Sequence, residues 1–423
     1  MNHDSLAQIF MLLPVPERIA MEKEACELAW YDIKKYTFGE TTSRFFDESL
    51  FAPSYIEKLL SNFGIYLRDL SLFEHCNSSI MPIIGERCKN LTRLNLIYNE
   101  LLEMNIDHYI RAFKNLDKLT IIEIRVMNMG SCYNTKFQPH IINYLPEEMI
   151  KIILEYDKEE YMSPKIFDIK KFKKLQYLSL KGCLLDDMIQ EISETTTLVE
   201  LSLIDCFVRN ESINTIVTIS NWKKLKHLIL FNDEGCDVID DNIIGPAPSV
   251  VNFDELSKLQ YLESLSLFNM YNFPDSSIIA IANSCKNLRK LEMTACVNIT
   301  EAALMPIISL EKLEEINVNY MNGLTDNFIS KLKGLKKFGC ACCKNITDAG
   351  IIEFIKNCPN LHTLCVFGCN ITIKTFIGAD EITKHRTNNI ALGISYEDFA
   401  EASTLKIESN WLFICPKVRE NVK

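Results

Sequence analysis

Cysteine is the residue type in this chain with the clearest potential for chemistry, and six of its sixteen cysteines stand between positions 340 and 369. Thiolates bind zinc when a pair two to four residues apart meets a second such pair, and a thiolate beside a base is a nucleophile. The group consists of Cys340, Cys342, Cys343, Cys358, Cys365 and Cys369. The neighbouring His362 has no second ligand at motif spacing, so the sequence favours neither zinc binding nor thiol catalysis.

A second group that could do chemistry is acidic: five carboxylates stand between positions 233 and 241. They are Asp233, Glu234, Asp237, Asp240 and Asp241. A calcium loop needs ligands at alternate positions and a closing glutamate, and this order is absent, so we interpret the segment as a solvated loop. The chain also lacks the glycine-rich phosphate-binding motifs. We therefore predict no cofactor and no bound metal.

These residues are positioned by a repeat of the form Leu-x-x-Leu-x-Leu-x-x-Cys, whose clearest copies begin at Leu175, Leu198, Leu288 and Leu361. Stacked units of this kind bury their apolar edges against one another and form an extended surface that commonly binds proteins. Eight cysteines occupy two fixed columns, one eight residues after the leading leucine and one three residues before it. The columns hold Cys183, Cys206, Cys296, Cys343, Cys369, and then Cys88, Cys285, Cys358. We interpret them as small buried side chains whose S–H groups donate to turn carbonyls.

The leading leucines divide the chain into a solenoid of about 12 repeats, most of them ~20–29 residues apart, and flanking segments. They are Leu67, Leu91, Leu116, Leu175, Leu198, Leu225, Leu262, Leu288, Leu313, Leu335 and Leu361. The repeat is irregular at 125–174, where Met149 to Leu154 is the expected strand, and at 233–254; a weak last strand is expected at 390–394. The predicted organisation is a helical module at 1–40, a linker or first capping unit at 41–66, the solenoid at 67–395 and a C-terminal tail at 396–423.

One unit shows how the repeat should fold. Leu361, Leu364 and Val366 alternate with outward residues, as in a short parallel strand whose apolar side faces the solenoid. In the preceding unit Thr347 or Asp348 can cap a helix, because both residue types accept hydrogen bonds from free backbone N–H groups. Ile351, Ile352 and Ile355 are the expected inward face of that helix, and Cys358 with Pro359 should end it.

Composition restricts the function further. The net charge of −11 argues against nucleic-acid binding, which needs a clustered basic surface. The apolar run from Leu6 to Val15 lacks a basic flank and contains two prolines, so it is not interpreted as a signal peptide. No stretch approaches ~20 uncharged apolar residues, so we expect no membrane span. Many thiols without a secretory signal indicate a reducing compartment, the cytoplasm or the nucleus.

The N-terminal residues do not fit the repeat. A short amphipathic helix should end at Leu13-Pro14, and a second should begin at Pro16-Glu17, with proline in the first turn and glutamate near the positive helix end. Two or three helices in some thirty residues cannot bury their apolar faces alone. This module therefore either caps the solenoid or docks onto a partner.

The repeat columns resemble the cysteine-containing subtype of leucine-rich repeats over about three quarters of the chain. The agreement rests on three features together: the leucines, the cysteines and the Ile-Thr-Asp step, as at Ile346 to Asp348. This resemblance implies an α/β fold, a leucine-rich-repeat solenoid in the form of a horseshoe with a parallel inner sheet and outer helices. The small module before it is expected to be all-α.

The N-terminal module resembles an F-box, and the whole chain is similar to the F-box/leucine-rich-repeat proteins. The matching residues are Leu6, Ile9, Phe10, Leu13, Pro14, Ile19, Ala25, Cys26 and Trp30. The module departs from the family in having no opening Leu-Pro pair, Glu27-Leu28 where a basic pair is usual, and Trp30 one residue late. The resemblance implies that Leu6, Ile9, Phe10, Leu13, Pro14, Ile19, Cys26 and Trp30 bind a Skp1-type adaptor and, through it, a cullin.

The function implied is substrate recognition in a Skp1–cullin–F-box ubiquitin ligase, with no catalysis by this chain; the alternative is a protein-interaction scaffold outside ubiquitin ligases. The sixth residue after each leading leucine should face the concave side. This column reads Phe73, Ile97, Ile122, Lys181, Ile204, Phe231, Phe268, Thr294, Asn319, Ala341 and Phe367. We predict that Phe73, Ile97, Ile204, Phe231, Phe268 and Phe367 bind a protein target, because exposed apolar patches mark interaction sites. Alternatively, these rings lean onto neighbouring strands, or they lie under the tail around residues 411–413.

Overall fold

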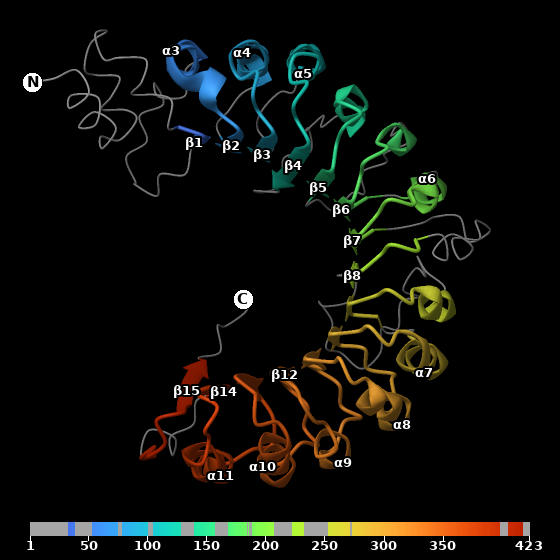
Figure 1. Ribbon diagram of the computed structural model, residues 1–423, viewed down its shortest axis with the longest axis vertical. Coiled ribbons are helices and arrows are strands. Elements are labelled where there is room, and N and C mark those ends of the chain that lie inside the picture. The colour runs from blue at the N-terminus through green and yellow to red at the C-terminus, as the bar shows by residue number, and fades with distance from the viewer. Residues whose placement is uncertain are drawn as a thin grey trace, which may run out of the picture. The chain divides into compact units, whose positions relative to one another are not determined.

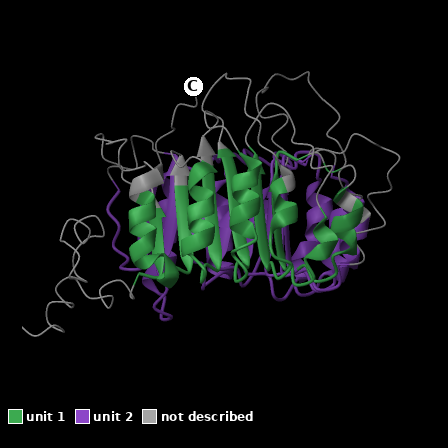
Figure 2. Ribbon diagram, turned by 90° about the horizontal axis from the view of Figure 1, so that it is seen from above, with its two compact units in different colours: residues 1–198 green, residues 199–423 purple. Residues whose placement is uncertain are grey.

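The structure is a computed structural model, and it describes residues 33–38, 53–74, 78–99, 105–127, 139–156, 168–183, 185, 188–206, 222–231, 253–270, 273–397 and 405–417. The predicted adaptor-binding residues between Leu6 and Trp30, and the acidic segment at 233–241, lie outside these ranges. The chain divides into two compact units, residues 1–198 and 199–423, coloured separately in Figure 2. Within the described ranges, no helix is long and apolar enough to cross a membrane.

The first unit is a parallel sheet with helices on one face (Figure 1). Its strands pair in chain order: β1 (Lys35–Phe38), β2 (Asp69–Glu74), β3 (Arg93–Asn99), β4 (Ile121–Met127), β5 (Lys151–Tyr156) and β6 (Tyr177–Lys181). Its helices are α3 (Pro53–Phe63), α4 (Met81–Arg87), α5 (Ile106–Phe113) and α6 (Met188–Glu194). Short 3₁₀ turns are η3 (Gly64–Tyr66), η4 (Ser78–Ile80), η5 (Pro139–Tyr144) and η6 (Ile169–Lys171).

The second unit repeats the same arrangement of strand, turn and helix. Its strands also pair in parallel and in chain order: β7 (Glu200–Ile204), β8 (His227–Phe231), β9 (Ser264–Phe268), β10 (Lys290–Thr294), β11 (Glu315–Asn317), β12 (Lys337–Gly339), β13 (Thr363–Cys365), β14 (Leu392–Glu397) and β15 (Leu412–Lys417). Its helices are η9 (Phe253–Lys258), α7 (Asp275–Ser284), α8 (Glu301–Leu304), η10 (Met305–Ser309), α9 (Asp326–Ile329), α10 (Asp348–Asn357) and α11 (Ile373–Lys384).

Leucine columns form the core, as the sequence predicts. Leu291 pairs with Ile316, and the same register continues through Phe338, Leu364 and Ile394 on the next strands. All five are at most 2% exposed. Each buried side chain of this size contributes about 1.5–3 kcal/mol from the hydrophobic effect. Since every strand buries its apolar side against the next repeat, this is the core of a stacked solenoid.

One repeat was assigned the wrong register from the sequence. Leu94 of β3 pairs with Ile122 of β4, so the leading leucine of that repeat is Leu119 and not Leu116. Ile122 is therefore a core residue with no exposed surface, and Arg125 takes its place in the outward column. Leu116 occupies the column of Cys88, which also accepts apolar residues, and this substitution misled the pattern. The expected strand at 149–154 is confirmed as β5.

In seven of the described repeats the turn after the strand requires an unusual backbone conformation. The seventh residue after the leading leucine has a positive φ at Gly182, Asp205, Asn269, Ala295, Tyr320, Cys342 and Gly368. In this conformation the N–H of Asp205 donates to the carbonyl of Phe231, and that of Ala295 to Asn319, at 2.7 and 2.9 Å. The left-handed conformation costs an L-residue about 1–2 kcal/mol. The bonds to the neighbouring repeat offset this cost and fix the end of each strand.

Acid–threonine pairs join consecutive repeats on the helix side of the second unit. The carboxylate of Asp326 accepts from the N–H and the hydroxyl of Thr347 at 2.8 and 2.6 Å. We call these contacts rungs; the others join Asp275 to Thr300, Glu301 to Thr325, and Asp348 to Thr372. Thr300, Thr325 and Thr372 cap their helices, because their side chains accept from helix N–H groups. The predicted cap at Thr347 is not made: its side chain accepts from no helix N–H group, although its hydroxyl donates to Asp326 as those of the other three threonines donate to their acids.

Helix α10 agrees with the prediction except for one residue of its inward face. It ends at Asn357, before Cys358 and Pro359, as expected. Ile351 and Ile355 are buried, but the third buried apolar side chain of the expected face is Phe354 rather than Ile352. Ile352 is half-buried, and its side chain lies so close to Gly378 of α11 that a Cβ there would meet it at 2.7 Å. Ile352 thus packs between helices rather than against the sheet.

Both ends of the described sheet continue beyond the leucine pattern. Strand β1 lies within the segment assigned to the helical module, and Tyr36 packs against Phe63 of α3 with ring centroids 5.3 Å apart. Strand β14 covers the weak last strand expected near 390–394. Strand β15 lies in the segment expected to be a tail and pairs with β14. Residues 411–413 therefore lead into β15 at the edge of the sheet, rather than across the predicted column.

Candidate functional site

The open face of the sheet, which the helices do not cover, is the surface that the sequence analysis expects to be concave. Strand β8 shows the alternation: Leu228 and Leu230 are buried, whereas His227, Ile229 and Phe231 are half-buried. These three stand two, four and six residues after the leading Leu225. The predicted direction of the outward columns is therefore confirmed for this strand.

An apolar cluster occupies the open face of β7, β8 and β9 in the second unit. Ile204 pairs in register with Phe231, and Phe231 with Phe268. The two rings lie 5.5 Å apart between centroids at an interplanar angle of 47°, a tilted aromatic contact. All three side chains are half-buried. They join a continuous apolar surface across three strands, since adjacent strands are about 4.8 Å apart.

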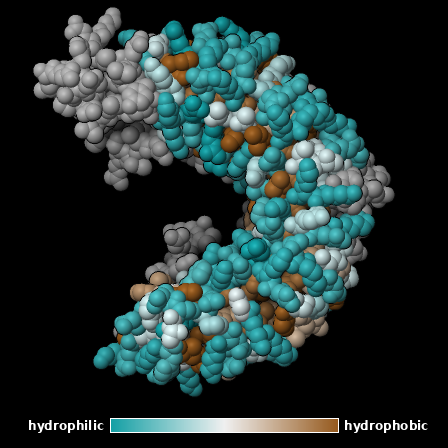
Figure 3. Space-filling view, in the orientation of Figure 1, coloured by the Kyte–Doolittle hydropathy of each residue, from teal (hydrophilic) through white to brown (hydrophobic). Residues whose placement is uncertain are grey.

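Ile229 belongs to the same apolar cluster, although it is not among the residues predicted to bind a target. It is half-buried and stands on β8 two residues before Phe231, so both side chains leave the sheet on the same face. The column four residues after each leading leucine carries this signal, since most of its members are polar and Ile229 is not. We define the apolar cluster as Ile204, Ile229, Phe231 and Phe268. Figure 3 shows hydrophilic side chains predominating over the face that it presents, with hydrophobic ones scattered among them.

Other predicted target-binding residues are placed differently. Ile97 is 8% exposed and offers little surface to a ligand. Phe367 is half-buried on the open face, but Thr294, Asn319 and Ala341 occupy the same column between it and Phe268. Phe73 lies in β2 opposite Ile97, and its side chain is outside the described part. Within the second unit, the structure therefore brings Ile204, Phe231 and Phe268 together and leaves Phe367 apart from them.

The open face of the first unit carries charges instead. Asp69 lies between Lys35 and Arg93 at 3.8 and 3.9 Å. Glu123 lies between Arg93 and Arg125, at 3.7 Å from each, and Arg125 also reaches Glu155 at 2.8 Å. We call this row of Lys35, Asp69, Arg93, Glu123, Arg125 and Glu155 the charge ladder. Its alternating signs satisfy one another within the sheet and leave little net charge for a ligand.

The column cysteines are structural, as predicted. Cys285 donates to the carbonyl of Leu259 at 3.4 Å, and Cys343 to that of Val318 at 3.2 Å. Burial raises the pKa of Cys285 to about 11 and that of Cys343 to about 12, so these thiols stay protonated. Among the described residues, no three histidine, cysteine, aspartate or glutamate side chains converge as a metal site would require. Cys369 departs from its column in being only half-buried.

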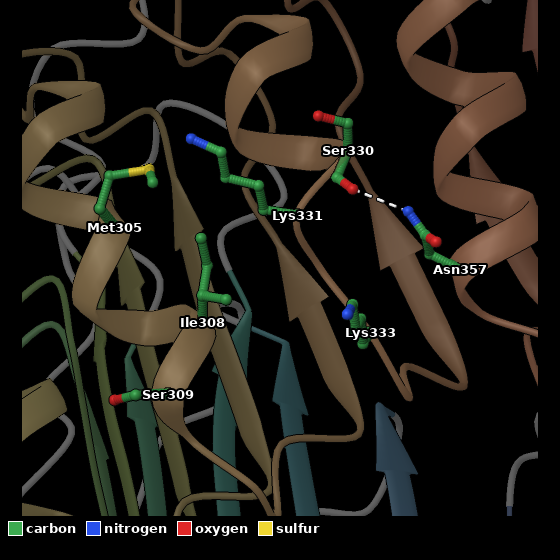
Figure 4. Close-up of a pocket in the computed structure, with 7 residues that line it drawn as sticks. All are labelled: Met305, Ile308, Ser309, Ser330, Lys331, Lys333 and Asn357. Atoms are coloured by element: carbon green, nitrogen blue, oxygen red, sulfur yellow. Dashed lines mark hydrogen bonds between the residues drawn. The ribbon is translucent and has the colours of Figure 1, made fainter.

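A hollow of about 720 Å³ lies on the helix side of the second unit (Figure 4). It is lined by Met305, Ile308, Ser309, Ser330, Lys331, Lys333 and Asn357. Asn357 donates to the carbonyl of Ser330 at 2.7 Å, which links α10 to the end of α9. The lining contains no carboxylate, histidine or cysteine, so it offers neither a general base nor a nucleophile. Its shape and chemistry do not suggest an active site.

Parallel strands in chain order, leucine columns in register and helices on one face define a leucine-rich-repeat solenoid. A chain in the crystal structure of the Rad7 and Elc1 complex of yeast has this fold: the superposition covers 96% of this chain and 90% of that chain, with a TM-score of 0.52 and 16% identity. No family model matches the sequence.

Two curated proteins are similar in part of their sequence. The Antagonist of mitotic exit network protein 1 of Saccharomyces cerevisiae is 30% identical over 115 residues, 26% of this chain and 18% of that protein. The F-box protein MAX2 homolog A of Petunia hybrida is 28% identical over 124 residues, 28% of this chain and 15% of that protein. The chain thus spans less than a third of the length of the curated relatives that it matches.

Proposed function

We propose that this protein is the substrate-recognition subunit of a Skp1–cullin–F-box ubiquitin ligase, holding the adaptor through its N-terminal module and a target protein through the open face of the sheet. The observation that carries the target-binding half is the apolar cluster. Four half-buried apolar side chains on a solvent-facing sheet exceed what a solvated surface needs, and aromatic anchors dominate protein–protein binding energy.

The adaptor-binding half rests on sequence. Leu6, Ile9, Phe10, Leu13, Pro14, Ile19, Cys26 and Trp30 match the F-box pattern, and a partial relative is described as an F-box protein. The structurally similar chain comes from a crystal structure of the complex of Rad7 and Elc1. This agrees with the proposal that the present chain acts as part of a complex. In the proposed assembly the Skp1-type adaptor connects the chain to a cullin.

Catalysis in this proposal is proximity. The solenoid holds a target so that one of its lysines stays near a ubiquitin-loaded enzyme, and the raised effective concentration accelerates transfer. This chain then breaks and forms no bond itself. The column thiols of Cys285 and Cys296 support this reading, because both are buried with raised pKa values and a thiol that carried ubiquitin would need an accessible thiolate.

The alternative is a protein-interaction scaffold whose first forty residues only cap the solenoid. One observation favours it: residues 33–38 already belong to the solenoid, because Ile33 is 8% exposed and β1 pairs with β2. This leaves fewer residues for a separate docking module.

Co-purification with a Skp1-type adaptor separates the two proposals. Leu13→Ala with Ile19→Ala should abolish adaptor binding, because truncating two aliphatic anchors in a small interface costs several kcal/mol. The matched control truncates two exposed aliphatics, Ile279→Ala with Ile377→Ala on α7 and α11, and should bind normally. Circular dichroism should show both variants folded. Full adaptor binding by the folded Leu13/Ile19 variant would exclude the F-box function.

A further inference from the structure

We propose that Cys340 and Cys369 form a peroxide-sensitive dithiol that closes to a disulfide between two neighbouring repeats of the second unit. Cys340 directly follows β12, and Cys369 lies in the turn after β13. Their sulfur atoms are 3.9 Å apart, in direct contact. A disulfide needs sulfurs at about 2.05 Å, so closure requires an adjustment of the two side chains rather than an unfolding.

Cys340 is unusual for its place in the repeat. It stands five residues after the leading Leu335, a position that holds Val318 in the repeat before and Val366 in the repeat after. It is fully buried, so an aliphatic side chain would pack there as well. The repeat therefore explains Cys369, which belongs to the cysteine column, but not the thiol opposite it.

Cys369 has the character of the attacking sulfur. It is half-buried, whereas Cys340 is fully buried. The hydrogen bond from the Cys340 thiol, with further help from the backbone N–H of Cys343 and the charge of Lys344, lowers the pKa of Cys369 although burial opposes the shift. The same contact and burial raise the pKa of Cys340. A half-buried thiol with a lowered pKa, in contact with a fully buried thiol, is the arrangement of an attacking and a resolving cysteine, and the Cys369 thiol also donates to the carbonyl of Cys340 at 2.9 Å.

Cys285, Cys296 and Cys358 share one feature with Cys369, whose thiol donates to the carbonyl of Cys340 at 2.9 Å, but among the described residues none of the three contacts a second thiol. Cys285 and Cys358 donate to the backbone carbonyls of Leu259 and Leu332, and burial raises the pKa of each to about 11. Cys296 likewise donates to a backbone carbonyl, and burial raises its pKa to about 12. These three serve as internal controls within the same protein.

The oxidant is a peroxide, and the chemistry balances in two steps. The Cys369 thiolate attacks one peroxide oxygen; an S–O bond forms, the O–O bond breaks, and the leaving hydroxide takes a proton, which gives a sulfenic acid and water. The Cys340 sulfur then attacks the Cys369 sulfur; an S–S bond forms, the S–O bond breaks, and a second water leaves with the Cys340 proton. Two thiols are oxidised and one peroxide is reduced.

The consequence is local. The bond would fasten the end of β12 to the turn after β13, two residues beyond Phe367 on the open face. Because this bond would restrict how the two repeats separate, the oxidised protein should melt at a higher temperature, and a reductant should reverse the change.

The full chain is reduced, freed of reductant, titrated with hydrogen peroxide, blocked with iodoacetamide, digested with trypsin and analysed by mass spectrometry. The expected product links residues 338–344 to residues 357–374, at peroxide doses that leave Cys285 unmodified. Both peptides contain several cysteines, so the single variants C342S, C343S and C365S locate the bond; the link should survive in all three.

Two further variants decide the assignment. Cys340→Val, which matches the neighbouring repeats, should remove the link and leave a sulfenic acid at Cys369 that dimedone labels; Cys369→Ser should remove both. A link that persists in either variant overturns the proposal. So does the lack of a link at doses that oxidise the exposed Cys415, or a Cys340→Val variant that dimedone does not label at Cys369.

Discussion

Two stretches of the open face, β1 to β5 in the first unit and β7 to β9 in the second, carry different chemistry on the same kind of backbone. In the first unit, the positions that leave the sheet hold the charge ladder, in which Glu123 is shared between Arg93 and Arg125. In the second, equivalent positions on β7 to β9 hold the apolar cluster. Since these columns do not enter the core, a repeat fold can change them without losing stability. The comparison teaches that the leucines determine the fold and the outward columns determine binding.

The charge ladder and the apolar cluster also differ in how many of their side chains already have interaction partners within the protein. Each charge in the ladder already has a partner within 4 Å, and ion pairs at a protein surface contribute only about 0–1 kcal/mol. A ligand would have to replace these contacts. The apolar cluster has no such competitor among the described contacts apart from the ring pair of Phe231 and Phe268. Burying the cluster against a partner is therefore the more favourable use of the open face.

The largest effect should come from truncating the cluster. Phe231→Ala with Phe268→Ala should lower target capture by on the order of a hundredfold or more, because each aromatic anchor contributes about 2 kcal/mol or more. Adaptor binding and the melting temperature should change little. The proteins retained by the full chain are compared by quantitative mass spectrometry with those retained by a matched ladder variant, Arg93→Ala with Arg125→Ala. The apolar cluster is not the binding surface if the ladder variant loses the same proteins, or if the melting temperature of the cluster variant falls by several degrees.

A smaller effect separates the turn glycines of the two units. Gly182→Ala in the first unit should cost about 3 kcal/mol or more, since φ is 66° and a Cβ would lie 2.2 Å from the carbonyl oxygen of Tyr156. Gly334→Ala in the second should cost only about 1–2 kcal/mol, because φ is 74° but nothing lies within 4 Å. Urea unfolding measures both. Equal losses would mean that the contact with the neighbouring repeat contributes nothing.

Acid should weaken the helix side of the second unit. Burial alone would raise the pKa of Asp348, but hydrogen bonds from Thr372 and Thr375 outweigh it and lower the pKa. The resulting stability is present above the unfolded pKa of about 4 and is lost as pH falls through the lower, folded value. Asp348→Asn should therefore cost about 1–2 kcal/mol at neutral pH and less in acid. Unfolding across pH, with the exposed Glu353→Gln as control, tests this; a difference that does not vary with pH contradicts it.

The smallest effect concerns the ladder. Glu123 has a 14% exposed side chain between two arginines, so Glu123→Gln should cost about 1 kcal/mol or less. High salt should shrink the difference, because it screens the ion pairs that the glutamine has lost. Urea unfolding at low and high salt measures it. Loss of target capture by this variant would show that the target binds to the first unit instead of the apolar cluster.

Sequence alone predicted the leucine columns and the buried column thiols, because each depends on a residue type that recurs at fixed spacing. It also predicted Ile204, Phe231 and Phe268 as one outward column. It failed where a leucine stood in another column of the repeat. Leu116 occupies the column of Cys88 and was therefore mistaken for the leading leucine of its repeat.

Contacts between repeats were harder to predict than positions within one. The ring pair, the rungs and the contact between Cys340 and Cys369 each join residues more than twenty positions apart. The position of a residue in the repeat specifies on which face of the sheet its side chain lies. It does not specify which side chain of the neighbouring repeat it contacts. The ladder was missed for the same reason: its members are ordinary surface residues until parallel register aligns them.

The rungs have a consequence for curvature. Adjacent strands lie about 4.8 Å apart, whereas packed helices need about 8–10 Å, so stacked repeats must bend locally toward the strand side. Each rung fixes the spacing on the helix side by joining a carboxylate to the threonine of the next repeat, and Glu301 uses one methylene more than Asp326. The rungs thus influence the angle between neighbouring strands from the helix side of the sheet. Residues that never touch a ligand would then determine how closely the side chains of the open face converge on one.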